Sequence, residues 1–241
     1  MTLWTVVMPL LAVAALIALV YRITLSTSRR TRDILLSLLA LFLCLLINTP
    51  GVYEGLDDFL GGKNFAYLGV QIFWCLFLHL LISAILCTKA RARIASLTLL
   101  VVAIVTQVIS SVALSGHSET NYRILDYRET VSGATLAMST NIYSALVALI
   151  LAIHLIRSAF SQETPRQTRR RAGFALTGSG LLVGDLAALE RIIFAGSTRG
   201  HLILDGSLVL LALILILVGL LLTFTDVRRQ RQPPKTRGER I

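Results

Sequence analysis

The stretch 202-LILDGSLVLLALILILVGLLLTF-224 contains one charged residue, Asp205, and is apolar on every side of a helix. Helices of soluble domains carry one apolar stripe, whereas a helix that is apolar all round is buried in a large core or in lipid. At about 1.5 Å per residue, this run is long enough to cross the roughly 30 Å of hydrocarbon in a bilayer. The stretch therefore predicts a membrane-spanning helix.

Six more apolar runs precede it, and the composition of the whole chain agrees with this pattern. Of the 241 residues, 55% are hydrophobic and only 15% are charged, outside the usual range of soluble domains. The alternating strands of a transmembrane barrel are absent from the sequence. We therefore predict an all-α polytopic membrane protein, with a seven-transmembrane-helix bundle over residues 1–227 and a disordered basic tail over 228–241. The seven runs are Leu3–Ile23, Ile34–Thr49, Ala66–Cys87, Ile94–Ser115, Ser139–Phe160, Ala172–Ala195 and Leu202–Phe224.

The basic residues predict the orientation of this bundle. Eighteen of the 23 lie in the first, third and fifth connections or in the tail. Cytoplasmic connections of membrane proteins are enriched in Lys and Arg. We expect these connections and the C-terminus inside the cell and the N-terminus outside, in a multi-pass protein of the plasma membrane. The opposite side has only Lys63, Arg123, Arg128, Arg191 and Arg199.

A net charge of +10 could also indicate nucleic-acid binding. The basic residues lie beside apolar runs, however, and no nucleic-acid-binding motif accompanies them. Topology and contact with anionic lipids explain the charge, so we expect the lipid bilayer as a partner and no nucleic acid. The basic fifth connection, residues 157–171, is a candidate contact for a cytoplasmic protein partner.

The motifs of several intramembrane activities are missing. A retinal protein needs a lysine in its last helix, and the three lysines are elsewhere in the chain. Leu182–Asp185 lacks the GxGD pattern of aspartyl intramembrane proteases. The three cysteines form no CxxC pair and the four histidines are scattered, so no metal and no cofactor is expected. We therefore predict no enzymatic activity.

Ionisable residues inside a span are costly unless paired or hydrated, which makes them candidate functional residues. Asp185 lies about midway along the sixth run, with Glu190 and Arg191 nearer its outer end. For Arg191 we expect a structural ion pair with Glu190 or Asp205, with a ligand site as the alternative. Asp185 is expected to face the interior, because it adjoins a stripe of small residues suited to close helix packing: Gly180, Gly184 and Ala188.

His79 in the third run and His154 in the fifth are the other polar candidates. Because neighbouring spans run in opposite directions, His79 and Asp185 are predicted at similar depth. A contact between them could relay protons or bind a cation. The alternative is a neutral His79 that bonds to a backbone carbonyl or to Thr106 or Gln107 of the fourth run.

The second connection, residues 50–64, reads PGVYEGLDDFLGGKN. Its apolar residues share one helical face, which predicts a short amphipathic helix at the outer interface, with Glu54, Asp57 and Asp58 mostly turned away. Gly61 and Gly62 then provide a stop. The fourth connection, residues 116–138, is predicted as a long loop.

This connection and the run after it resemble an uncharacterised family of actinobacterial membrane proteins with an N-terminal seven-helix region. The resemblance implies that Pro50, Asp57, Gly62 and Asn64 belong to a shared structural corner at the outer face. Longer members carry a cytoplasmic C-terminal domain where this chain has its short basic tail. The matching pattern is Pro50-x-Val52, Leu56-Asp57 and Gly62-x-Asn64-x-Ala66, before a span containing His79.

The topology and the missing catalytic motifs together predict a non-enzymatic sensing or signalling component of the membrane. The alternative is a transporter of a small solute, ion or proton that uses His79, His154 and Asp185. Transporters often contain internal repeats and paired broken helices, and the sequence shows neither.

Overall fold

The computed structural model describes residues 3–23, 29–86, 90–115, 131–161, 168–193 and 202–230. Within these residues the chain forms eight helices and no strand, which confirms the all-α prediction for the described part. The helices are α1 (Leu3–Ile23), α2 (Arg29–Ile47), α3 (Pro50–Phe59), α4 (Phe65–Ile85), α5 (Ala90–Ser115), α6 (Val131–Phe160), α7 (Thr168–Ile193) and α8 (Leu202–Gln230).

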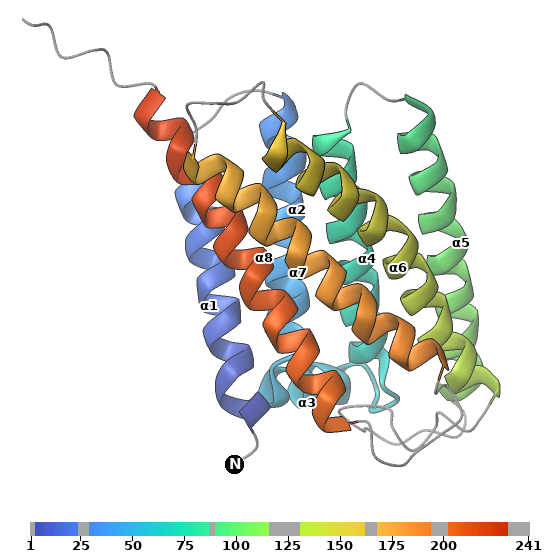
Figure 1. Cartoon of the computed structure of the whole chain (residues 1–241). Coiled ribbons are helices and arrows are strands. Elements are labelled where there is room, and N and C mark those ends of the chain that lie inside the picture. The colour runs from blue at the N-terminus through green and yellow to red at the C-terminus, as the bar shows by residue number, and fades with distance from the viewer. Residues whose placement is uncertain are drawn as a thin grey trace, which may run out of the picture.

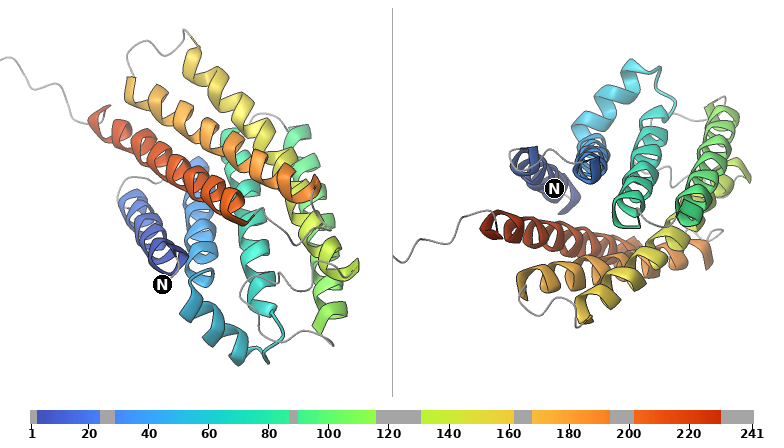
Figure 2. Two further views of the ribbon diagram at one scale, coloured as in Figure 1. Left: turned by 60° about the horizontal axis from the view of Figure 1, so that its bottom comes forward. Right: turned by 90° about the horizontal axis from the view of Figure 1, so that it is seen from above.

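The seven long helices form a closed ring in chain order. Leaving α3 aside, each packs against the next, and α8 returns to pack against α1. Figures 1 and 2 show two layers, in which α1, α2, α4 and α5 stand side by side while α6, α7 and α8 cross them diagonally. Consecutive long helices run in opposite directions, so α1 begins at one end of the bundle and α8 finishes at the other (Figure 1).

Six helices are long and apolar enough to cross a membrane: α1, α4, α5, α6, α7 and α8. By length and composition they are compatible with a multi-pass membrane protein. α2 meets the same standard only together with α3, and the two are bent by 88° at their junction. The bend occurs where Thr49 is extended and Pro50 begins α3, since proline has no N–H to continue the hydrogen bonding of α2.

Two helices extend into segments that the sequence predicted as a long loop or a disordered tail. α6 begins at Val131, so the last part of the connection predicted as a loop over 116–138 is helical. Leu136 is buried in this extension and packs with Leu114 of α5. The hydropathy of residues 116–138 alone does not reveal this tertiary contact. α8 continues to Gln230, three residues into the tail predicted as disordered, and the remainder of the tail lies outside the described residues.

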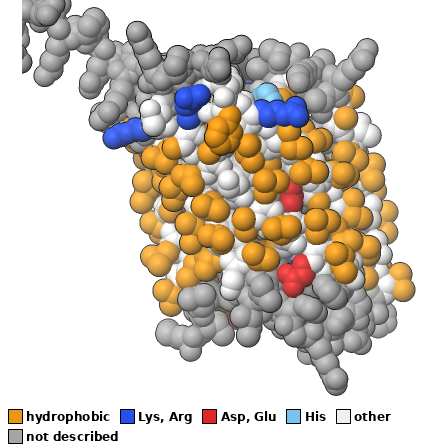
Figure 3. Space-filling view, viewed as in Figure 1, with side chains coloured by type: hydrophobic (Ala, Val, Ile, Leu, Met, Phe, Trp, Pro, Cys, Tyr) orange, Lys and Arg blue, Asp and Glu red, His pale blue; other side chains and the backbone are white. Residues whose placement is uncertain are grey.

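The outer surface of the bundle is apolar, with basic side chains at one end. Leu10, Ile17, Ile109 and Leu186 are each more than half exposed. Figure 3 shows a broad apolar belt beneath a rim of Lys and Arg side chains. We call this end, where Arg22, Arg157 and Arg169–Arg171 lie, the basic end, and the opposite one the α3 end (Figure 1). An apolar belt of this breadth fits lipid better than water.

Glycines bring α7 and α8 into backbone contact. A Cβ atom at Gly173 would lie 2.7 Å from the carbonyl oxygen of Gly219, and one at Gly180 would lie 2.9 Å from that of Ala212. Real Cβ atoms essentially never approach other atoms so closely. The predicted small-residue packing is therefore confirmed at Gly180, while at Gly184 a Cβ would meet only the Ala212 methyl group at an ordinary 3.7 Å.

Replacing Gly180 by Ala should destabilise the bundle, although alanine is the better helix former by about 0.5–1 kcal/mol. The added methyl group forces α7 away from α8, at a cost of about 1–3 kcal/mol. Gly184→Ala, one turn away on the same helix, is the matched control and should leave the melting temperature of the purified protein unchanged or slightly raised. Equal melting temperatures for the two variants would contradict the close approach.

Candidate functional site: a polar cavity between the layers

A cavity of about 240 Å³ lies between the two layers. α2 and α4 form one wall, and α6, α7 and α8 form the other. Its lining residues come from the last turns of α2, the first half of α4, the first half and middle of α6, the second half of α7 and the first half of α8. Because consecutive helices run in opposite directions, all of these segments belong to the α3 half of the bundle. The basic end is therefore on the far side of the core from the cavity.

Two buried polar atoms in the cavity wall have no hydrogen-bond partner. They are Oδ2 of Asp185 on α7 and Oε1 of Gln71 on α4. The two residues are only 7% and 5% exposed. Buried polar atoms are nearly always hydrogen-bonded, because leaving one unpaired costs about 1–3 kcal/mol. The wall thus presents two hydrogen-bond acceptors, one of them a carboxylate oxygen, from opposite layers.

Trp74, Ser144 and Thr140 in the wall are paired. Trp74 Nε1 on α4 donates to Ser144 Oγ on α6 at 2.8 Å, which ties the two layers together and fixes the indole ring. Thr140 Oγ1 on α6 accepts from Gln107 Nε2 on α5 at 2.8 Å. Gln107 Oε1 and Ser111 Oγ of α5 also lack partners, but neither residue lines this cavity.

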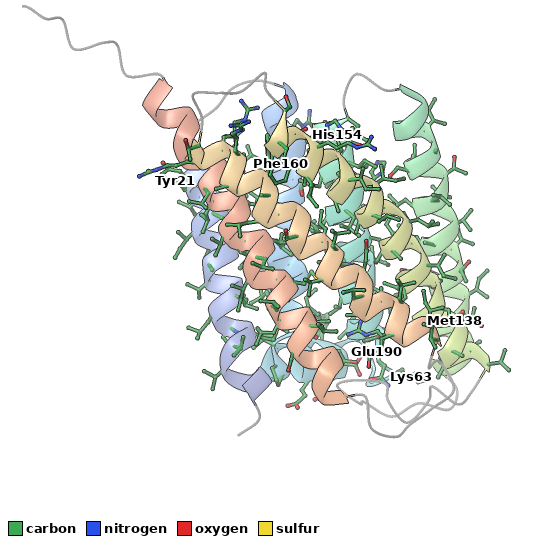
Figure 4. The ribbon with its side chains drawn as sticks, in the orientation of Figure 1. Tyr21, Lys63, Met138, His154, Phe160 and Glu190 are labelled. Carbon is green, nitrogen blue, oxygen red and sulfur yellow. The ribbon has the colours of Figure 1, made fainter. Side chains whose placement is uncertain are left out.

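The structure does not bring His79 and Asp185 together. The His79 ring nitrogen Nδ1 lies 3.0 Å from Ser96 Oγ of α5, and His79 is not part of the cavity wall. The predicted alternative named a backbone carbonyl, or Thr106 or Gln107 of the fourth run. The structure pairs the ring with Ser96 of that same helix, while Thr106 donates to the carbonyl of Val102. A bond from His79 to a backbone carbonyl stays a prediction. His154 lies near the end of α6, toward the basic end (Figure 4).

Glu190 and Arg191 lie in the last turn of α7, and Arg191 lines the cavity on its α3 side. Figure 4 shows Glu190 at the α3 end of the bundle, opposite His154. The side chain of Asp205, one of the two predicted partners of Arg191, lies outside the described residues, and the pairing with Glu190 stays a prediction. Of the sequence-predicted candidates, the structure therefore places Asp185 and Arg191 on one cavity and leaves His79 and His154 away from it.

Sequence reasoning missed Gln71, Trp74 and Asn141, which also line the cavity. Gln71 and Asn141 are amides inside apolar spans, and this was a usable signal because such groups need partners in lipid. Trp74 gave no comparable signal. Among the described residues, no group of three His, Cys, Asp or Glu side chains is arranged to hold a metal ion.

The corner between α3 and α4 is built around Asp57. Its carboxylate accepts from the backbone N–H groups of Asn64 at 2.9 Å and Ala66 at 3.1 Å, and so caps the start of α4. Tyr53 donates its hydroxyl proton to Asn64 Oδ1 at 3.0 Å. The backbone of Gly62 donates to the carbonyl of Asp57 at 2.7 Å.

Left-handed backbone makes this turn possible. Gly61, Gly62 and Asn64 have φ angles of 103°, 65° and 60°, and glycine and asparagine are the residues that tolerate this region best. The structure thus brings Asp57, Gly62 and Asn64 together, with Pro50 at the start of α3. The prediction that Asp57 turns away from the bundle is wrong. Asp57 is completely buried, because capping α4 outweighs the amphipathic pattern of α3.

No protein-family model, curated protein or solved structure matches this chain. The resemblance to an actinobacterial seven-helix family therefore stays a prediction, and the case for function depends on the cavity itself.

Asp57→Ala should lower the stability of the bundle by about 1–3 kcal/mol, because two buried N–H groups at the start of α4 lose their acceptor. The matched control is Asp58→Ala, since Asp58 is the exposed neighbour on the same helix. It should change stability by less than about 0.5 kcal/mol. Thermal unfolding of both variants in lipid nanodiscs compares them. Similar losses from both substitutions would show that the corner does not depend on this cap.

Proposed function

We propose that this chain is a non-enzymatic sensing or signalling component of the plasma membrane that receives a small solute in its cavity. Seven helices cross the bilayer, with the N-terminus outside and the basic end in the cytoplasm. The observation that carries the proposal is the cavity itself. It lies in the half of the bundle away from the basic end, and two unpartnered, buried acceptors line it.

The charge distribution supports this orientation. Among described residues, Arg22, Arg157 and Arg169–Arg171 all lie toward one end, as the cytoplasmic enrichment of basic residues requires. α2 completes the seventh crossing in this proposal, and α3 turns aside to lie along the outer interface. The exposed side chains of Val52, Phe59 and Leu60 suit that position.

The helices that form the cavity also reach the basic end, which gives a solute a route to influence a partner. α7 carries Asp185 in the cavity wall and Arg169–Arg171 at its other end. Arg171 donates to the carbonyl oxygens of Ala159 and Ser161 at 3.0 and 2.9 Å, so α6 and α7 are held together there. A ligand that shifts the second layer against the first would move this basic surface, where we place a cytoplasmic protein partner.

A transport pathway, the alternative function, has less support. Such a path would have to continue from the cavity to the basic end. In the next turns of α4 and α6, Phe77, Leu78 and Leu151 are fully buried and apolar. The proposed relay also lacks its first link, because His79 lies outside the cavity wall and Oδ2 of Asp185 has no hydrogen-bond partner.

Cysteine labelling tests whether the cavity is open to the exterior. In a background with Cys44, Cys75 and Cys87 replaced by alanine, Ala137→Cys places a thiol in the cavity wall. In intact cells, membrane-impermeant trimethylammonioethyl methanethiosulfonate should modify it from outside. Ala152→Cys is the control on the same helix, since Ala152 is completely buried and outside the cavity wall, and it should stay unmodified.

The opposite labelling pattern contradicts the proposal. If Ala137→Cys reacts only after the membrane is permeabilised, the cavity faces the cytoplasm. If it never reacts while a cysteine at exposed Phe59 does, the cavity is closed to solutes and the sensing role has no site.

A further inference from the structure

We propose that the cavity binds a small organic ammonium ion, whose N–H groups donate to Asp185 and Gln71. This inference deepens the proposed function by naming the ligand class, and it rests on the cavity described above. Ordered water is the competing occupant of such a site, and the experiment below is designed to separate the two.

The unpartnered atoms specify hydrogen-bond donors. An ionised carboxylate oxygen and an amide oxygen carry no hydrogen. Oδ2 of Asp185 and Oε1 of Gln71 can therefore act only as hydrogen-bond acceptors. They belong to different layers, α7 and α4, so a ligand between the layers can reach both. A group with several N–H donors, as in a primary ammonium ion, satisfies two acceptors with one atom.

In its ionised form, Asp185 specifies a cation. A carboxylate among membrane-spanning helices is expensive unless it is paired or hydrated. Arg191 is the one other ionisable Asp, Glu, Lys or Arg in the described wall. It lies six residues further along α7, about 9 Å at the helical rise, on the α3 side of the cavity. A cationic ligand at Asp185 therefore occupies the deeper part of the cavity, away from the guanidinium.

The aromatic wall favours an organic cation. Trp74 and Tyr67 of α4 line the same cavity as Asp185. Tryptophan is the best partner for a cation above an aromatic ring, and the interaction is stronger when water is excluded. The hydrogen bond from Trp74 to Ser144 holds the indole in place before any ligand arrives, so little entropy is lost on binding.

The size and donor set of the cavity argue against a bare metal ion. Calcium takes 6–8 oxygen ligands at short distances, and magnesium needs an octahedral set. The described part of the chain holds no cluster of three acidic, histidine or cysteine side chains that could supply one. A space of about 240 Å³ is also far larger than one ion needs, whereas it suits a small organic molecule.

Three probes of nearly equal shape test the charge requirement: benzylammonium, benzyl alcohol and benzoate. The chain has two tryptophans, Trp4 and Trp74, so a Trp4→Phe variant leaves Trp74 as the only indole and as a reporter inside the cavity. In lipid nanodiscs, benzylammonium should change Trp74 fluorescence saturably. Benzyl alcohol and benzoate should bind at least tenfold more weakly.

Variants test the residues in the same Trp4→Phe background. Asp185→Asn keeps the shape of the side chain but removes its charge, and should weaken benzylammonium binding at least tenfold. Gln71→Met should weaken it less, because the charge remains. Glu54→Gln is the control, since it removes an exposed carboxylate on α3, outside the cavity wall, and should leave the affinity unchanged. Ala137→Phe fills the cavity from α6 and should abolish binding with Asp185 intact.

Several outcomes overturn the inference. Equal responses to benzylammonium and benzyl alcohol, unaltered affinity in a folded Asp185→Asn variant, or no saturable response all leave ordered water or an apolar solute as the occupant. A stabilisation by NaCl or KCl that depends on Asp185, without a benzylammonium response, assigns the site to an inorganic cation. These results are distinguishable from failure of the proposed function, because Ala137→Cys labelling from outside reports the cavity independently of any ligand.

Discussion

A polar group surrounded by hydrocarbon has no water to bind, and this constraint shapes the whole bundle. Polar side chains on the long helices turn back to a carbonyl or across to a neighbouring helix. Ser37 donates to the carbonyl of Phe77 at 3.2 Å, and Thr177 donates to that of Gly173 at 2.9 Å. The unpartnered acceptors on Asp185 and Gln71 depart from this pattern, as do those on Gln107 and Ser111, but only Asp185 and Gln71 among these four residues line the cavity.

Close packing between α7 and α8 is the complement of this constraint. With lipid outside, apolar burial does little to hold helices together, and association depends on tight van der Waals contact. Gly173, Gly180 and Gly219 allow that contact on the side of the bundle that α8 closes against α1. The backbone-to-backbone interface packs α7 and α8 tightly against each other along this face.

Much of the fold was predictable from the sequence, and little of the site was. Runs of apolar residues predict helices, and the glycine spacing around Gly180 predicts close packing. The hydrophobic pattern of α3 alone could not show that Asp57 turns inward. The hydrogen-bond donors to its carboxylate are backbone N–H groups seven and nine residues away. The partner of His79 was equally hidden. Counting residues along each span predicted His79 and Asp185 at similar depth in the membrane. It could not tell whether the two helices face each other within the ring of seven long helices.

The proposed function depends on the direction in which the helices cross the membrane. Epitope tags before Leu3 and after Ile241, tested by protease treatment of intact cells, measure that direction at both ends of the chain. The account predicts that the N-terminal tag is removed and that the C-terminal tag survives until the membrane is permeabilised. Removal or survival of both tags would mean an even number of crossings. Removal of the C-terminal tag alone would mean that the cavity faces the cytoplasm, and either result contradicts the account.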